Sequence, residues 1–265
     1  MTRKTEFDME IEKKEYLGRA DIITMELAEE TTSIGDWAFA KCPNLKNVMI
    51  PDTIEHIGRD VFLDCKALKS IHVYHGSHLP GGETGLCTAA LRADALHLKM
   101  GIPLQKLICS SLHEWITEWD NALLAVLKKP EDEGYVPFYA GGEEDYEEGD
   151  EARKEYAKKR RIMIANAITD RFLLANASPE AECDDVFLNE AGGFLTDSLA
   201  GDSAAGLFSE REVLIRETVE LYFEKGYMKR ANIPGLLDGL SGEKTELRSL
   251  IMRHSSVLEG DIFSI

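Results

Sequence analysis

Two stretches of the sequence repeat each other at a fixed spacing. The first reads IGDWAFAKCPNLKNVMIP over residues 34–51, and the second reads IGRDVFLDCKALKSIHVY over residues 57–74, an offset of 23 throughout. Ile, Gly, Phe, Cys and Leu recur at identical places, and a degenerate third copy begins near Tyr16. Similarity sustained at one fixed period of this length is the signature of a repeat protein.

The apolar positions of each copy predict its local structure. Each copy ends in a Leu-x-x-apolar-x-apolar pattern, whose final alternation is typical of a short strand with one buried side. Phe39 and Phe62 lie on the returning segment, where we expect them to fill the interior. Alternation along the strands points Met25, Val48 and Ile71 inward and leaves two outward rows. These outward residues are Thr24, Asn47 and Ser70 in one row, and Glu26, Met49 and His72 in the other.

The repeated pattern IGxxAFxxCxxLxxVxIP resembles the leucine-rich repeat of the BspA-like family, which is common in bacterial and some protist proteins. The resemblance covers about residues 16–75, with Val61 and Tyr74 standing where the family usually has Ala and Pro. It implies a solenoid of stacked short strands and a role in binding other proteins.

The length of the repeat array predicts how the rest of the chain is used. About 2.5 repeats leave one hydrophobic face uncovered, whereas roughly three are usually needed for stability. After about residue 84 the apolar period changes to that of helices. We therefore expect an α+β protein in which a leucine-rich-repeat solenoid at 1–80 is capped by an α-helical domain at 81–265.

Several helices are expected in the second part. Their markers are an apolar stripe, a capping box and Gly or Pro at helix ends. The glycine-rich residues 189–206 predict a loop. The last two short helices bear a weak similarity to ankyrin hairpins. The predicted helical segments are Leu104–Leu127, 151–175, one opened by Ser209-x-x-Glu212 and ending at Lys225-Gly226, Ile233–Leu240 and Glu243–His254.

Charge excludes some classes of partner. The chain has 30 Lys and Arg against 48 Asp and Glu, a formal net charge of −18, which disfavours nucleic acid and anionic membranes. Residues 131–151 hold ten acidic residues and no basic one, and predict an exposed acidic loop. There is no apolar segment typical of a signal peptide or a membrane span, so we expect a cytoplasmic protein.

Motifs that carry chemistry are sparse. The nucleotide-binding and hydrolase fingerprints are absent, so we expect no catalytic residue and no cofactor. His72, His75 and His78 are spaced so that they suggest a metal site, but surface histidines are the favoured interpretation and no metal is expected. Cys42 and Cys65 occupy neighbouring turns, close enough for a disulfide, although reduced buried thiols are favoured.

Two hypotheses about function remain. The first is a non-catalytic module that binds a protein partner through the six outward strand residues. The alternative is an enzyme of unknown class with its site in the helical domain or at the junction of the two parts. The acidic loop, recognised by a basic partner, is a further possibility.

Overall fold

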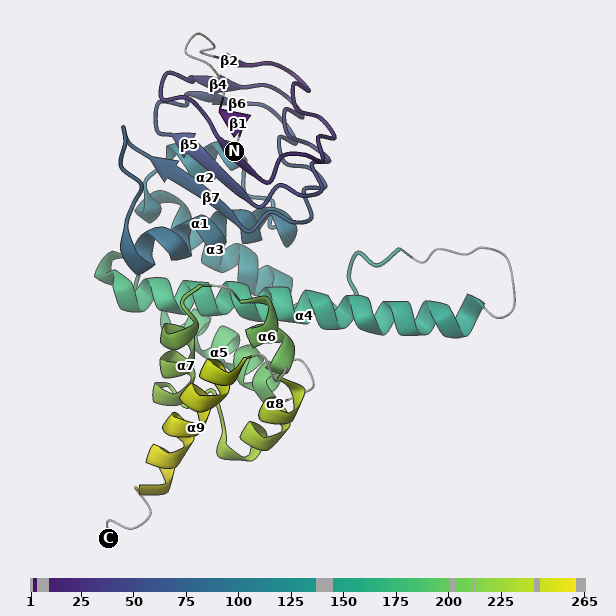
Figure 1. Ribbon diagram of the computed structural model, residues 1–265, viewed down its shortest axis with the longest axis vertical. Coiled ribbons are helices and arrows are strands. Elements are labelled where there is room, and N and C mark those ends of the chain that lie inside the picture. The colour runs from purple at the N-terminus through teal and green to yellow at the C-terminus, as the bar shows by residue number, and fades with distance from the viewer. Residues whose placement is uncertain are drawn as a thin grey trace. The chain divides into compact units, whose positions relative to one another are not determined.

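The computed structural model describes residues 2–3, 10–136, 145–200, 204–211, 213–240 and 244–260 (Figure 1). The chain divides into two compact units, Met1–Leu123 with Leu174–Glu182, and Leu124–Leu173 with Cys183–Ile265. The expected boundary after residue 80 therefore falls inside the first unit. The reason is that the helix directly following the repeats packs against their last strand.

The first unit begins with two parallel sheets. The larger has the order β1-β3-β5-β7, formed by Thr2–Arg3, Thr24–Glu26, Asn47–Pro51 and Ser70–Tyr74. The smaller has the order β2-β4-β6, formed by Glu10–Ile11, Ser33–Ile34 and His56–Ile57. In each pairing a residue faces the one 23 positions later, as Met25 faces Val48. The repeated architecture thus extends N-terminal of residue 16, where the sequence pattern was first recognisable.

Aromatic rings and thiols stack through the interior of the repeats. The rings of Tyr16, Phe39 and Phe62 are stacked, with centroids 5.0 and 5.6 Å apart. Phe39 is 0% and Phe62 6% exposed, which confirms that the returning segments fill the interior. Cys42 Sγ donates to the Tyr16 carbonyl at 3.1 Å, and Cys65 Sγ donates to the Phe39 carbonyl at 3.0 Å. Both thiols are free, as favoured from the sequence, and burial raises the pKa of Cys65 to about 11.

The repeated glycines allow successive turns to approach closely. A Cβ atom at Gly35 would lie 2.6 Å from the Lys13 nitrogen, and one at Gly58 would lie 2.4 Å from the Asp36 nitrogen. Any larger residue would therefore displace the backbone of the preceding turn. Glu12 holds the equivalent place in the first turn, so that turn lacks the glycine that marks the other two.

Three helices follow the repeats: α1 (Gly82–His97), α2 (Leu104–Cys109) and α3 (Leu112–Leu127, whose last residues belong to the second unit). The single stripe expected over Leu104–Leu127 is thus divided in two. The division has a local cause, because the Ser111 backbone nitrogen and hydroxyl both donate to the Glu114 carboxylate, at 2.7 and 2.8 Å. This is a capping arrangement that starts α3 afresh.

Side chains of α1 and α2 donate hydrogen bonds to carbonyl groups of the last repeat turn. From α1, His97 Nε2 donates to the Cys65 carbonyl at 3.3 Å. From α2, Gln105 Nε2 donates to the Glu55 carbonyl at 2.7 Å, and Cys109 Sγ to the Ile54 carbonyl at 3.2 Å.

The same carbonyl positions one turn earlier are satisfied by the next repeat. The Thr31 carbonyl accepts from Thr53 Oγ1 at 2.8 Å, and the Thr32 carbonyl accepts from the Glu55 nitrogen at 2.8 Å. These two carbonyls are equivalent to those of Ile54 and Glu55. Helix side chains therefore occupy the places that a further repeat would take.

Helices dominate the second unit. They are α4 (Asp145–Ala177, whose last residues belong to the first unit), α5 (Asp185–Ala200), α6 (Ala204–Glu210), α7 (Ile215–Glu224), α8 (Ile233–Gly239) and α9 (Thr245–Gly260). The expected acidic loop at 131–151 is wrong at its end, because α4 begins at residue 145 and not at 151. Acidic residues are favoured near a helix N-terminus, so an acidic composition there does not exclude a helix. Residues 137–144 lie outside the described part.

The loop expected at 189–206 is also wrong, since α5 continues to Ala200. Phe187, Ala191, Leu195 and Leu199 recur every four residues and are all buried. This spacing forms one apolar side of a helix. The glycine content that suggested a loop instead allows close packing, because a Cβ atom at Gly192 would lie 3.1 Å from the Tyr227 ring.

The expected capping box at Ser209 is a third correction. Ser209 lies inside α6, where its hydroxyl donates to the Ala205 carbonyl at 2.8 Å. The following helix, α7, begins at Ile215. Its end agrees with the sequence, because Lys225 is the C-cap and Gly226 has a φ of +73°. Such a glycine is the usual way to end a helix.

Candidate functional site

The predicted outward residues form one surface on the larger sheet. Thr24, Asn47 and Ser70 are aligned across β3, β5 and β7, and so are Glu26, Met49 and His72. The intervening Met25, Val48 and Ile71 are each 0% exposed. We call the half-exposed set the outer strand face; its members are Thr24, Glu26, Asn47, Met49, Ser70 and His72.

Hydrogen bonds hold this face in a fixed shape. Ser70 Oγ donates to Asn47 Oδ1 at 2.9 Å, which joins two neighbouring strands on their outer side. The Tyr74 hydroxyl donates to the Leu27 carbonyl at 2.6 Å and so reaches two repeats back. Burial, together with the nearby positive charge of Arg92, lowers the pKa of His72. His72 is therefore neutral near pH 7, and Glu26 supplies the formal charge of the face.

The three histidines that suggested a metal site do not converge. His75 Nδ1 lies 2.6 Å from Asp52 Oδ2, while the His75 and His78 backbones pair with each other. His72 lies on the outer strand face. Within the described ranges, no group of three or more potential ligands is placed to hold a metal ion.

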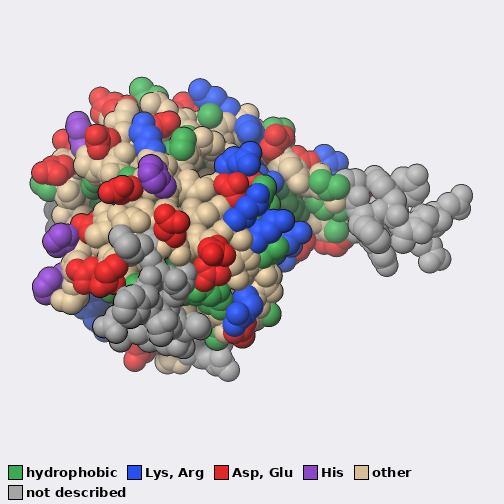
Figure 2. Space-filling view, turned by 90° about the horizontal axis from the view of Figure 1, so that it is seen from above, with side chains coloured by type: hydrophobic (Ala, Val, Ile, Leu, Met, Phe, Trp, Pro, Cys, Tyr) green, Lys and Arg blue, Asp and Glu red, His purple; other side chains and the backbone are tan. Residues whose placement is uncertain are grey.

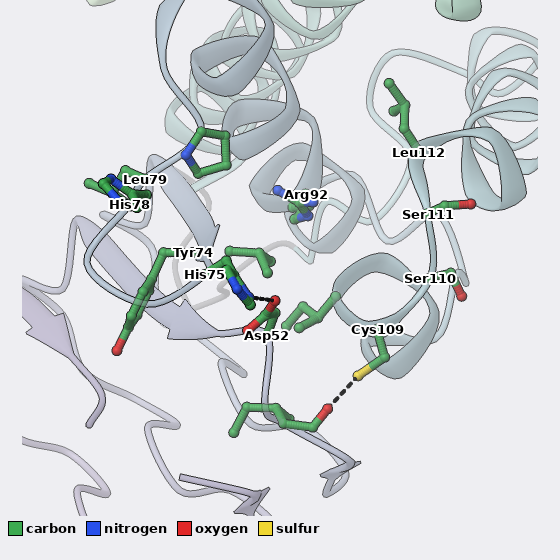
Figure 3. Close-up of a pocket in the computed structure, with 14 residues that line it drawn as sticks. Asp52, Tyr74, His75, His78, Leu79, Arg92, Cys109, Ser110, Ser111 and Leu112 are labelled. Carbon is green, nitrogen blue, oxygen red and sulfur yellow. Dashed lines mark hydrogen bonds and ion pairs between the residues drawn. The ribbon is translucent and has the colours of Figure 1, made fainter. Parts of the chain in front are cut away.

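A pocket lies at the end of β7, within the first unit (Figure 3). Its volume is about 600 Å³. Tyr74 and His75 line it from the end of the strand, Arg92 from α1, and Ser110–Leu112 from the junction of α2 and α3. The pocket was not predictable from the sequence, because its lining comes from separate segments that share no motif.

Arg92 is the largely buried charged group of this pocket. Its Nε donates to the Leu107 carbonyl at 2.8 Å, and its Nη1 to the Ile71 carbonyl at 3.4 Å. The guanidinium also lies 5.7 Å from the centre of the Trp115 ring. Burial lowers the Arg92 pKa to about 10, so the group is still positively charged at neutral pH.

A second cationic feature surrounds Trp37 on the returning segments. The Lys13 and Lys14 ammonium groups lie 5.0 and 5.6 Å from the Trp37 ring centre, and the Arg59 guanidinium lies 5.7 Å from it. Arg59 also pairs with Asp36 at 3.3 Å. Figure 2 shows Lys and Arg side chains gathered along one side of the face it presents, with acidic side chains among and beside them. Mixed charge of this kind does not define an anionic partner.

The groups that could suggest catalysis have structural partners. Partial burial raises the pKa of the Cys109 thiol, which donates to a backbone carbonyl and is not activated as a nucleophile. In the second unit, Arg211 pairs with the buried Asp170, and the Thr169 and Tyr222 hydroxyls lie 2.7 Å apart. These contacts join α4 to α7 and to the segment after α6.

Comparisons with known proteins agree with the repeat architecture. Residues 9–78 match the family model described as the BspA type leucine rich repeat region, so this segment is a BspA-type leucine-rich repeat. The match includes the N-terminal turn that the sequence pattern alone left incomplete. Neither the curated proteins nor the solved structures yield a match to the chain. Among the described residues, no helix is long and apolar enough to cross a membrane.

Proposed function

We propose that this protein is a non-catalytic interaction module that binds a protein partner through the outer strand face. Leucine-rich repeats generally mediate protein–protein interaction, and residues 9–78 are of this type. The observation that carries the proposal is the alignment of two half-exposed rows on β3, β5 and β7. Polar and flexible apolar side chains are combined there, as is typical of recognition surfaces.

Helices α1 and α2 have a supporting role in this proposal: they cap the repeat array. The cap supplies donors to the carbonyls of the last turn, from His97, Gln105 and Cys109. An uncovered terminal strand would otherwise be open to pairing with other chains. With the cap in place, the face is rigid and available for a specific partner.

The test is affinity capture from a lysate of the native cell, with the bound proteins identified by mass spectrometry. Met49→Glu places a charge in the middle of the outer strand face and is expected to abolish capture. The matched control is Met252→Glu, because Met252 is 58% exposed on α9 and lies outside the face. As with most surface changes, the free energy of unfolding of both variants should lie within about 0.5 kcal/mol of the wild-type value.

Each other outcome contradicts a stated part of the proposal. If Met49→Glu unfolds the protein, the outer strand face is structural. If Met49→Glu captures the same partner as the wild type, that partner binds elsewhere, and the acidic residues 131–151 become the better candidate. If only Met252→Glu loses capture, the helical unit carries recognition.

A further inference from the structure

The pocket at the end of β7 is lined by the largely buried guanidinium of Arg92 and by the Asp52 carboxylate. Both hydrogen-bond partners of Arg92 are neutral carbonyls, those of Leu107 and Ile71. Within the part of the chain that the structure describes, no carboxylate forms an ion pair with Arg92. Largely buried charges are costly unless an opposite charge accompanies them, so a guanidinium that lines a pocket without an ion-pair partner favours an anionic ligand.

We propose that this pocket binds a carboxylate group attached to a compact apolar body. A guanidinium offers parallel N–H donors that match a carboxylate in a bidentate pair. In Figure 3 the Arg92 side chain lies between the His75 side of the pocket and the side formed by Ser110–Leu112. A ligand entering the pocket therefore meets the guanidinium.

The remaining lining defines what is attached to the carboxylate. Ile54, Val73, Ile108 and Leu112 supply an apolar wall. A volume of about 600 Å³ lies in the range that small ligands occupy. The Asp52 carboxylate, 2.6 Å from His75 Nδ1, repels negative charge, and Arg92 offsets a single carboxylate, so a ligand with more than one negative charge is disfavoured. A monocarboxylate with an apolar body fits these conditions, and N-acetylleucine is a compact probe of that class.

The first experiment compares N-acetylleucine with N-acetylleucine amide, which differ at the carboxylate. Calorimetry should show saturable binding of the acid and binding of the amide that is weaker by about tenfold or more. Incorporated 5-fluorotryptophan reports the location, because the Trp115 ring lies beside Arg92. The acid should move the Trp115 fluorine resonance and leave that of Trp37 in place.

Three variants keep the test independent of folding defects. Arg92→Lys keeps the charge but loses the bidentate geometry. It should lower the affinity for N-acetylleucine by about tenfold. Since Arg92 also supports backbone carbonyls, Leu79→Glu serves as the second variant. Leu79 lines the pocket and is 48% exposed, so its replacement repels the ligand without disturbing the core. The matched control is Leu63→Glu, at a residue that is 45% exposed and outside the pocket lining, and it should bind like the wild type.

Further probes identify the source of the carboxylate. An acetylated hexapeptide ending in leucine that binds at least as tightly as N-acetylleucine indicates a peptide C-terminus. Binding of N-acetylleucine and hexanoate but not of the peptide indicates a small free acid. Both outcomes support the pocket.

The proposal is overturned by any of three results. These are equal binding of acid and amide, no saturable binding of the acid at millimolar concentrations, and wild-type affinity in Leu79→Glu. The two proposals are tested independently, because the pocket is probed with small molecules and the outer strand face with a protein partner. A negative result for the pocket does not affect partner capture, and a negative result for partner capture does not affect binding in the pocket.

Discussion

At the scale of single residues, each solenoid turn contains two left-handed backbone positions. Lys14, Trp37 and Asp60 have φ values of 61°, 56° and 53° at one of them. Gly18, Lys41 and Asp64 have values of 73°, 58° and 59° at the other. Only the first turn uses glycine, the residue that adopts this conformation without steric cost. The five positions that hold other residues, Lys14 of the first turn included, therefore carry local backbone strain.

Lys41→Gly is expected to stabilise the protein for this reason. Relief of the left-handed strain should exceed the entropy that glycine adds to the unfolded chain, and raise the free energy of unfolding by about 0.5–1 kcal/mol. The control is Lys46→Gly, at an exposed residue with ordinary φ just before β5, which should lower it by a similar amount. Urea unfolding measures both. Equal destabilisation by the two changes would contradict a left-handed Lys41.

The repeated sequence predicts buried residues better than backbone conformation. Phe39, Phe62 and the inward Val48 were identified because apolar identity recurs at the 23-residue offset. The left-handed positions were not, since Lys, Trp and Asp at equivalent places share no side-chain property. The first turn was incomplete in the sequence analysis because Glu12 replaces the glycine that marks the later turns.

At the scale of elements, helix α5 shows how composition can mislead. Its Gly192-Gly193 pair suggested a loop, while the spacing of four between its buried residues specified a helix. The two glycines differ in surroundings. A Cβ atom at Gly192 would meet the Tyr227 ring at 3.1 Å, whereas one at Gly193 would meet open space.

This difference gives a matched pair of variants on adjacent residues. Gly193→Ala should raise the free energy of unfolding by about 0.5–1 kcal/mol, because alanine has the higher helix propensity. Gly192→Ala carries the same propensity gain but must displace the Tyr227 ring, so it should be neutral or destabilising. The midpoints of urea unfolding compare the two. A gain of equal size in both variants would show that α5 does not pack against Tyr227.

The same scale explains why the pocket escaped prediction. The outer strand face follows from one strand pattern repeated at a known offset, so its rows were predictable from the sequence alone. Arg92, His75 and Ser111 meet only because α1 and the junction of α2 and α3 both lie near the end of β7. No local sequence pattern predicts that these residues line one pocket. The break between α2 and α3 at Ser110–Ser111 was also not predicted, because one continuous helix was expected there.

At the scale of the whole molecule, two features of the sequence are informative: the distribution of charge and the number of repeats. The acidic residues in 131–151 account for ten of the 18 net negative charges, so the rest of the chain is only mildly acidic. The last repeat turn is followed directly by helices, and α1 packs against β7. The α+β combination was predictable on these grounds. The hydrogen bonds from His97, Gln105 and Cys109 to carbonyls of the last turn were not predictable, because these residues belong to no repeat.

If the repeat array folds only together with its helices, residues 1–80 expressed alone should fail to fold cooperatively. Hydrogen exchange and thermal melting would be recorded on this fragment and on the full chain. In the full chain, the β7 amides should be protected and should open with the cooperative transition. The fragment should show unprotected β7 amides and no cooperative melting, since the last turn has lost its donors and its apolar cover. A sharp two-state transition of the fragment, with β7 protected as in the full chain, would show that the repeats fold without their helices.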